Sequence, residues 1–269
     1  MIQNPGLPRK GEDNMEIMLS TQNLRKEYGV KGMIYSALNG LDFEVEKGEF
    51  LGIMGPSGSG KTTLLNLLST IDRPTAGTIR FGDTDISTLK GEALARFRRD
   101  RVGFVFQDFN LLDNMTVMDN IALPLALNKV DHREINVRVR ELAEFFGIGS
   151  QLPKYPYQLS GGQKQRVAAA RALILRPTVI FADEPTGALD SKASSELLSC
   201  FMELNRQYGT TIVMVTHDAF AASWCGRILF LKDGSIHARL DGTGNRKNLF
   251  QKTLDMLASM GGASAHELF

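Results

Sequence analysis

The chain has 269 residues, 43% of them hydrophobic, and 31 basic residues against 30 acidic residues leave a formal net charge of +1. A chain of this length and composition can bury a large core, which argues against a disordered protein and predicts one α/β domain with at most a small appendage. Because no overall excess of positive charge exists, nucleic acid is not expected as a partner.

Nothing in the sequence points to export or to a membrane span. Residues 1–18 are expected to form a flexible tail, with Met15 as a second possible start, and no run of about 18 apolar residues follows. Cys200 and Cys225 stand in apolar surroundings without metal-like spacing, which predicts two buried thiols in a reducing compartment. Any membrane role would therefore need a separate partner.

Two kinds of strand are predicted. Leu41, Phe43 and Val45 alternate with acidic residues, and residues 79–81 repeat this period of two, which indicates half-exposed antiparallel strands near the start. Continuous apolar runs instead predict strands that are covered on both faces, as in a mainly parallel sheet. These runs are residues 50–54, 102–106, 179–182, 212–215 and 228–231.

Helical patterns alternate with these strands, so the expected class is α/β. Apolar residues share one helix face at i, i+4, i+7 and i+11 in two segments: Ile135, Val139, Leu142 and Phe146, and Leu197, Phe201, Leu204 and Tyr208. Residues 110–164 contain no core-strand run and are interpreted as a helical subdomain inserted into a domain that spans residues 19–240.

Residues 241–269 are predicted to be a C-terminal extension with an amphipathic helix. Phe250, Leu254 and Leu257 fall on one face of this helix. Docking of that face on the chain's own domain is favoured over binding of a separate partner.

A phosphate-binding loop follows the apolar run that ends at Met54. Gly55-Pro56-Ser57-Gly58-Ser59-Gly60-Lys61-Thr62 matches the pattern G-x-x-x-x-G-K-[ST] between a strand and a helix. The glycines let backbone N–H groups face the phosphates, while Lys61 would neutralise the β and γ oxygens and Thr62 would ligate Mg²⁺. A turn without a ligand is disfavoured by the flanking strand and helix, and a dinucleotide-binding motif by the missing third glycine.

Two carboxylates, Asp183 and Glu184, end the buried run 179–182. Adjacent carboxylates repel unless a cation or solvent accommodates them. Beside a phosphate loop, Asp183 suits the Mg²⁺ shell, and Glu184 suits the orientation and deprotonation of an attacking water. A solvated strand end is the alternative for the acidic pair taken alone.

A second candidate anion site is Leu159-Ser160-Gly161-Gly162-Gln163, directly before a predicted helix. The segment could be a simple N-cap and turn. A serine hydroxyl and glycine amides at a helix N-terminus also bind phosphate, however, and this chain already has one phosphate loop. Two such sites in one domain suggest that ATP is shared between two chains.

From about residue 19 to residue 239, the chain resembles the ATP-binding subunits of ABC transporters. The resemblance implies a P-loop NTPase fold with a mainly parallel core sheet, an N-terminal antiparallel β subdomain and an inserted helical subdomain. It implies ATP hydrolysis with ATP and Mg²⁺ as cofactors, and it gives catalytic roles to Glu184, His217 and Gln107.

The resemblance also assigns roles to residues that spacing alone does not single out. It implies that Tyr28 stacks on adenine, with Tyr35 as the competing tyrosine, that His217 reaches the γ-phosphate and that Asp190 couples two sites across a dimer. The residues placed at ATP are Tyr28, Gly55, Pro56, Ser57, Gly58, Ser59, Gly60, Lys61, Thr62, Thr63, Ser160, Gly161, Gly162, Gln163 and Asp190. Thr62, Gln107 and Asp183 are placed at Mg²⁺.

Longer stretches narrow the resemblance to one branch. Residues 72–77, 106–112 and 184–190 are similar to the lipoprotein-release, macrolide-export and bacitracin-resistance ATPases. Residues 181–184, 221–223 and 225–227 most resemble bacitracin-type exporters of antimicrobial peptides. Ser69-Thr70-Ile71 stands where macrolide and lipoprotein members tend to have a glycine pair, which favours the peptide-resistance group.

The resemblance further implies a homodimer at the cytoplasmic face of the membrane, an integral membrane permease and, through that permease, a sensor histidine kinase. Residues 109–115 would form the groove that receives the permease, with core packing as the alternative for half of their apolar side chains. A mechanotransmitting ATPase for lipoprotein release shares every motif. ABC ATPases of translation or DNA repair would need a second such domain or a long coiled coil, and a non-catalytic module would be expected to lack Lys61 or Glu184.

Overall fold

Two β-sheets carry the fold of the computed structural model, which describes residues 16–30 and 32–261. The smaller sheet has four strands in the order β2-β1-β4-β5. Its strands β1 (Ile17–Val30), β2 (Met33–Glu46), β4 (Ala76–Phe81) and β5 (Thr84–Asp85) pair antiparallel. This sheet is the antiparallel one expected near the start of the chain.

The larger sheet has six strands in the order β10-β9-β3-β8-β7-β6. Five of them are parallel, and β10 pairs antiparallel with β9. The strands are β3 (Phe50–Met54), β6 (Val102–Val105), β7 (Val179–Asp183), β8 (Thr211–Val215), β9 (Arg227–Lys232) and β10 (Ser235–Asp241). All five apolar runs of the sequence therefore form the parallel core.

The six-stranded sheet is covered on both faces because successive side chains of a strand point to opposite sides. Met54 and Ile180 belong to a core that also contains side chains of α5 (Gly161–Leu173) and α6 (Ser191–Tyr208). Ile53 and Phe181 belong to a second core, shared with α1 (Lys61–Leu68) and the four-stranded sheet. This burial explains why the runs are continuous rather than alternating.

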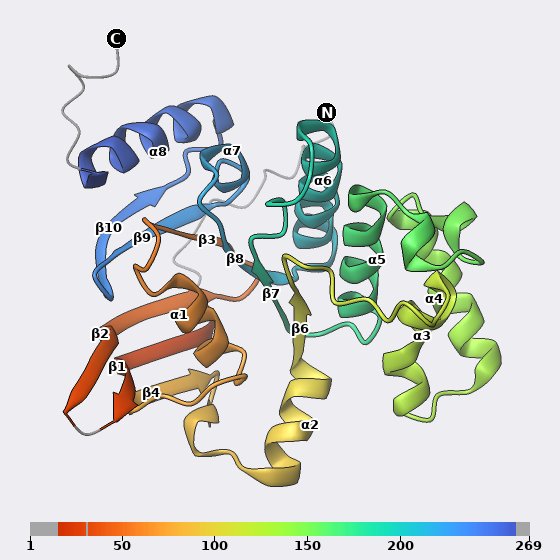
Figure 1. The fold of residues 1–269 in the computed structure, drawn as a ribbon, viewed down its shortest axis with the longest axis horizontal. Coiled ribbons are helices and arrows are strands. Elements are labelled where there is room, and N and C mark those ends of the chain that lie inside the picture. The colour runs from red at the N-terminus through yellow and green to blue at the C-terminus, as the bar shows by residue number, and fades with distance from the viewer. Residues whose placement is uncertain (1–15, 31, 262–269) are drawn as a thin grey trace, which may run out of the picture.

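The remaining helices surround these layers. They are α2 (Gly91–Arg101), α3 (Val117–Leu127), α4 (His132–Phe145), α7 (Ala219–Ala222) and α8 (Arg246–Gly261), with short 3₁₀ turns at Ile86–Thr88, Gly149–Gln151 and Pro156–Gln158. Figure 1 shows α3 and α4 beside α5, on the far side of the molecule from the four-stranded sheet. Within the described residues, no helix is long and apolar enough to cross a bilayer.

The C-terminal helix differs from the expectation in its buried face. Leu249, Thr253 and Met260 are buried. Of the predicted face, Leu257 packs against the core, but Phe250 is only half-buried and Leu254 is 40% exposed, so the buried face is rotated from the predicted one. Apolar residues occur on several sides of α8, so the sequence does not show which side is buried. The buried side includes the polar Thr253, which can be buried because its hydroxyl donates to the carbonyl of Leu249. The helix packs against α7 and β10 (Figure 1).

Smaller corrections concern the chain ends and single side chains. Strand β1 begins at Ile17, inside the expected tail 1–18, and residues 1–15 with the possible start Met15 lie outside the described residues. Tyr208 is 69% exposed because it is the last residue of α6 and extends past the core. Both thiols are free, but only Cys225 is buried and Cys200 is half-buried.

Candidate functional site

The phosphate loop connects β3 to α1 with a conformation that glycine makes possible. Gly60 has a φ of 100°, and a Cβ there would stand 2.6 Å from the carbonyl oxygen of Ala37. Gly60 is also the N-cap of α1 and offers no side-chain cap, so the first N–H groups of the helix remain available for a ligand. The Nζ of Lys61 donates to the carbonyls of Gly55 and Pro56, each at 2.9 Å.

Asp183, at the end of β7, completes a cation-binding set with this loop. Its Oδ1 is buried, and none of the described residues gives it a hydrogen-bond partner. Burial and the neighbouring charge of Glu184 raise the pKa of Asp183, while Thr62 and Lys61 act in the opposite direction. An unpartnered carboxylate oxygen beside a threonine hydroxyl is the oxygen donor set that Mg²⁺ takes together with phosphates, so the residues fit this ion.

Glu184 and His217 meet at the ends of the adjacent strands β7 and β8. The Nδ1 of His217 lies 2.9 Å from Oε1 of Glu184, and the backbone N–H of His217 donates to Oε2 at 3.2 Å. Glu184 has a φ of 46° and is only 14% exposed, whereas His217 is 70% exposed. A fixed carboxylate next to an accessible imidazole can orient a water molecule at the phosphate loop.

Lys61 links the loop to the acidic pair electrostatically. Burial lowers the pKa of Lys61, and the charges of Glu184 and Asp183 oppose this shift. The structure therefore brings together four of the predicted elements: the phosphate loop, Asp183, Glu184 and His217. They come from the carboxyl ends of three neighbouring strands, which is where open α/β sheets bind ligands.

Three other predicted residues lie outside this gathered set, Gln107 and Asp190 on loops and Tyr28 in strand β1. The side-chain amide of Gln107 lies against Gly187, with Nε2 3.3 Å from where a Cβ on that glycine would stand. Asp190 caps α6, because its Oδ1 accepts from the N–H of Ala193 at 2.8 Å. The hydroxyl of Tyr28 donates to Oδ2 of Asp72 at 2.9 Å.

The Ser160 segment is not brought to the phosphate loop of its own chain. Figure 1 shows α1 and α5 well apart, and Ser160 is the N-cap of α5. The N–H of Gln163 donates to Ser160 Oγ at 3.3 Å, and the N–H of Ser160 donates to Gln163 Oε1 at 3.0 Å. This capping box leaves the amides of Gly161 and Gly162 outside it.

Two residues that the sequence analysis did not single out hold the loop after β6. Arg171 of α5 donates to the carbonyls of Asn110 at 2.7 Å and Phe109 at 3.1 Å, and Gln165 donates to the carbonyl of Phe106 at 3.1 Å. Phe109 and Asn110 both have positive φ values, 61° and 49°. A helical pattern shows which residues share a face, but not which loop carbonyls they reach.

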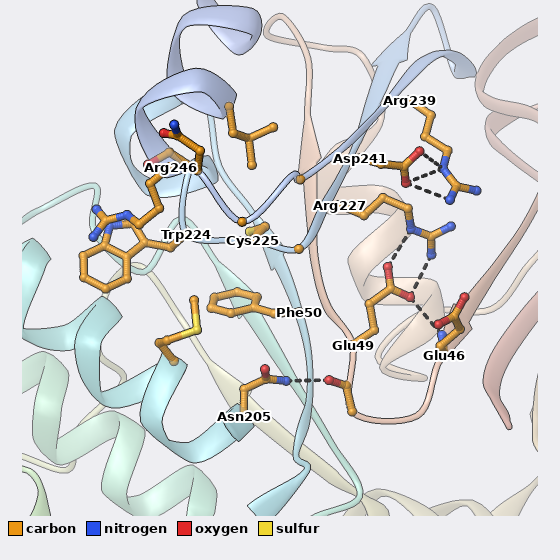
Figure 2. Close-up of a pocket in the computed structure, with 18 of the residues that line it drawn as sticks. Glu46, Glu49, Phe50, Asn205, Trp224, Cys225, Arg227, Arg239, Asp241 and Arg246 are labelled. Atoms are coloured by element: carbon orange, nitrogen blue, oxygen red, sulfur yellow. Dashed lines mark hydrogen bonds and ion pairs between the residues drawn. The ribbon is translucent and has the colours of Figure 1, made fainter. Parts of the chain in front are cut away.

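A hollow of about 470 Å³ lies where β3 and β9 begin, at the other end of these strands from the phosphate loop (Figure 2). Phe50 and Arg227, the first residues of β3 and β9, line it, whereas the phosphate loop follows the last residue of β3. Arg227 forms a bidentate ion pair with Glu49, and Arg246 stacks on Trp224 at 3.4 Å from the ring centroid. The strand length separates this hollow from the phosphate loop.

The family comparison agrees with this geometry. The family model described as ABC transporter matches residues 38–187, which include the phosphate loop, the Ser160 segment and the acidic pair. The chain belongs to the ABC transporter family. It is the ATP-binding and hydrolysing subunit of a transporter, with ATP and Mg²⁺ as cofactors, and its fold is the ABC ATPase fold expected from the sequence.

Individual ABC proteins match over most of the chain. YvcR of Bacillus subtilis, an ABC transporter ATP-binding protein, is 52% identical over 91% of this chain and 95% of its own length. The bacitracin export ATP-binding protein BceA of Halalkalibacterium halodurans is 48% identical over 91% of this chain and 97% of its own. The dimeric structure of the cassette MJ0796 has a TM-score of 0.78 and 39% identity over 83% of this chain and 98% of that one, and another of its dimers is a post-hydrolysis state with ADP and Pi.

Proposed function

We propose that two copies of this chain bind ATP between the phosphate loop of one copy and the Ser160–Gln163 segment of the other. The observation that carries the proposal is that Ser160, Gly161 and Gly162 stand at the N-terminus of α5, away from the phosphate loop of their own chain. Helix N-termini of this kind can bind a phosphate group. The dimeric form of the similar cassette MJ0796 supports the pairing. ADP lacks the γ-phosphate that bridges the two copies, so hydrolysis would reopen the dimer.

Each residue of the gathered set has a role in this proposal. Lys61 neutralises the phosphates, and Thr62 and Asp183 hold Mg²⁺, which would neutralise charge on the phosphates. Glu184 orients and deprotonates the attacking water, and the contact of His217 with Glu184 keeps the carboxylate in place.

The residues around the centre act on the nucleotide or on the second copy. Tyr28 stacks on adenine, Gln107 senses Mg²⁺ and water, and Asp190 couples the two sites. Gln107 lies against Gly187, which is three residues before Asp190. A movement of the Gln107 loop would therefore shift the loop that leads to Asp190.

The proposed contact with a membrane permease is the segment 109–115. Leu112 is 40% exposed in this segment, while Leu111 is half-buried against the core. The fully buried Asn120 accepts from the N–H of Leu112 and donates to the carbonyls of Leu112, Met115 and Thr116. A rigid loop with an exposed apolar side chain suits a partner that must transmit force. In this proposal, the contact with the permease would hold the chain at the cytoplasmic face of a membrane.

We further propose that the complex protects against or exports antimicrobial peptides of the bacitracin type. The support is the similarity to the bacitracin export protein over nearly its whole length. Ser69-Thr70-Ile71 also stands where macrolide-type and lipoprotein-type members tend to have a glycine pair.

The test is ATPase activity of the chain reconstituted in liposomes with its membrane permease. Bacitracin is expected to stimulate hydrolysis, a macrolide and a lipoprotein are not, and Glu184→Gln in the same complex removes the stimulated activity. Stimulation by the macrolide or the lipoprotein alone would contradict the peptide assignment. Co-purification of a sensor histidine kinase with the permease would extend the complex to signalling.

A further inference from the structure

A half-buried ion pair stands behind the tyrosine proposed to stack on adenine. The Nζ of Lys26 donates to Oδ1 of Asp72 and to the carbonyl of Arg73, both at 2.8 Å, and it lies 4.7 Å from the ring centroid of Tyr28. The Lys26 side chain is only 11% exposed. An ammonium desolvated to this degree and placed over an aromatic face is held there by both the carboxylate and the ring.

Asp72 holds the same ring at its other end. Its Oδ2 accepts the Tyr28 hydroxyl at 2.9 Å, and its Oδ1 accepts the N–H of Arg73 as well as Lys26. Burial raises the pKa of Asp72, but the hydrogen bonds from Lys26, Arg73 and Tyr28 outweigh it, so the pKa lies below the usual value. The carboxylate therefore remains charged at neutral pH and fixes Tyr28 in one position.

The loop that presents Asp72 is joined to both the phosphate-loop helix and β1. The N–H of Asp72 donates to the carbonyl of Asn66 in α1, and Thr75 accepts the N–H of Glu27 at 2.9 Å. Thr70, at the start of this loop, has a φ of 63° and a buried hydroxyl for which the described residues provide no partner. A β-branched residue in the left-handed region is strained, and such strain persists where the surrounding contacts require it.

The competing tyrosine, Tyr35, is not held in this way. Tyr28 and Tyr35 are opposite each other in the β1–β2 register, so both project from the same face of the hairpin. Tyr35 is 59% exposed against 41% for Tyr28, and its hydroxyl makes one long contact of 3.4 Å with the carbonyl of Gly58. The structure thus favours Tyr28 as the fixed platform.

We propose that Lys26 and Asp72 are positioning residues for adenine, which act by holding the Tyr28 ring in the place where the base stacks. The inference rests on the proposed adenine contact of Tyr28. A ring that is already fixed loses less freedom when the base binds, which strengthens binding without changing the chemical step. The pair therefore contributes to KM for ATP and not to kcat.

The experiment compares Lys26→Met, Asp72→Ala and Tyr28→Ala with the wild-type chain, and uses inorganic tripolyphosphate as a ligand without a base. Lys26→Met and Asp72→Ala are expected to raise KM for ATP about five- to tenfold, with kcat within about twofold. Affinity for tripolyphosphate, measured by competition with ATP, is expected to stay the same. Lys26→Arg, which can still pair with Asp72 and cover the ring, is expected to restore most of the ATP affinity.

Two controls separate positioning from folding. Lys47→Met removes the exposed pair of Lys47 with Glu16 and is expected to leave KM unchanged. In the double variant Lys26→Met/Tyr28→Ala, the lysine change is expected to add nothing to the effect of Tyr28→Ala, because it acts only through that ring.

Each outcome decides one part of the inference. Weaker binding of tripolyphosphate in Lys26→Met, or an additive loss in the double variant, would mean that the pair supports the phosphate-loop helix and would overturn the positioning role. An unchanged KM in Lys26→Met, with a raised KM in Tyr28→Ala, would overturn it while leaving the adenine contact intact. An unchanged KM in Tyr28→Ala would overturn the adenine contact itself.

Discussion

Helices α1 and α5 both begin at a glycine-containing segment, but their N-termini are built differently. Helix α1 starts at Gly60 without a side-chain cap, and Lys61, Asp183, Glu184 and His217 are gathered around it. Helix α5 starts at Ser160, which is already engaged in a capping box, and none of these groups is gathered there. In the proposed dimer, α1 therefore provides the groups for the phosphates and the metal, and α5 provides only the opposing surface of the site.

The largest expected effect comes from removing the proposed base beside the N-terminus of α1. Glu184→Gln keeps the size and the hydrogen-bonding reach of the side chain but removes the base, so turnover is expected to fall about a hundredfold or more while ATP still binds. Hydrolysis is measured as phosphate release, and ATP-dependent dimers as a shift in size-exclusion chromatography. Wild-type turnover in this variant, with the exposed Glu141→Gln as the control, would show that Glu184 is not the base.

The next effect separates capping from phosphate binding at α5. Ser160→Asp preserves an N-cap acceptor and adds a negative charge that repels the partner's γ-phosphate, so stability is expected to stay within about 0.5 kcal/mol of wild type while ATP-dependent dimerisation is lost. Ser160→Ala, by contrast, is expected to cost about 1 kcal/mol of stability through the lost cap. Both are measured by urea unfolding and chromatography. A Ser160→Asp chain that still dimerises with ATP would remove α5 from the nucleotide site.

Relief of backbone strain just after the C-terminal end of α1 is expected to have a smaller effect, and it should stabilise the chain instead of destabilising it. Thr70 has a φ of 63°, which glycine adopts freely, so Thr70→Gly is expected to stabilise the chain by up to about 1 kcal/mol. The adjacent Ser69 has a φ of −83°, and Ser69→Gly is expected to destabilise it. Urea unfolding of both variants measures these changes in the free energy of unfolding. A destabilised Thr70→Gly chain would mean that the contacts of the threonine contribute more than its backbone strain costs.

The smallest expected effect is a difference in the rate at which two cysteines are alkylated, Cys225 next to β3 and Cys200 on α6. Cys225 Sγ lies 3.0 Å from where a Cβ on Gly52 of β3 would stand, under the strand that leads to α1, whereas Cys200 is on α6, which packs against α5. Burial raises the pKa of both thiols, and Cys225 is buried in the turn between α7 and β9, whereas Cys200 is half-buried. Iodoacetamide is expected to label Cys200 slowly in the native chain and Cys225 only after unfolding, as mass spectrometry would show. Native labelling of Cys225 would indicate an opening near β3.

Local sequence patterns were sufficient for the arrangement of the strands, for the phosphate loop and for the acidic pair Asp183 and Glu184. Continuous apolar runs identified the parallel strands because both faces of that sheet are buried. The glycine spacing before Lys61 and the acids after residue 182 identified their loops because strand ends in such a sheet meet at one edge. The subfamily and the roles of Tyr28, Gln107, His217 and Asp190 came from the family resemblance and not from the local sequence patterns.

The features that could not be predicted from the sequence depend on contacts between segments far apart in the chain. Lys26 and Tyr28 are two residues apart on a strand and so share a face, but the partner Asp72 comes from a loop 44 residues beyond Tyr28. Arg171 reaches carbonyls about 60 residues before it. The buried face of α8 was assigned wrongly because Thr253 satisfies its hydroxyl on the helix itself. Periodicity cannot show such pairings.

The most direct test of the shared site mixes two inactive chains. Lys61→Ala disables the phosphate loop, and Ser160→Asp disables the opposing segment while it keeps the cap. If ATP is held between two copies, random pairing gives mixed dimers with one intact site, and an equal mixture is expected to recover on the order of a quarter of wild-type hydrolysis. A mixture as inactive as either parent, although both chains are folded and crosslinking shows that the two different chains pair with each other, would contradict the account.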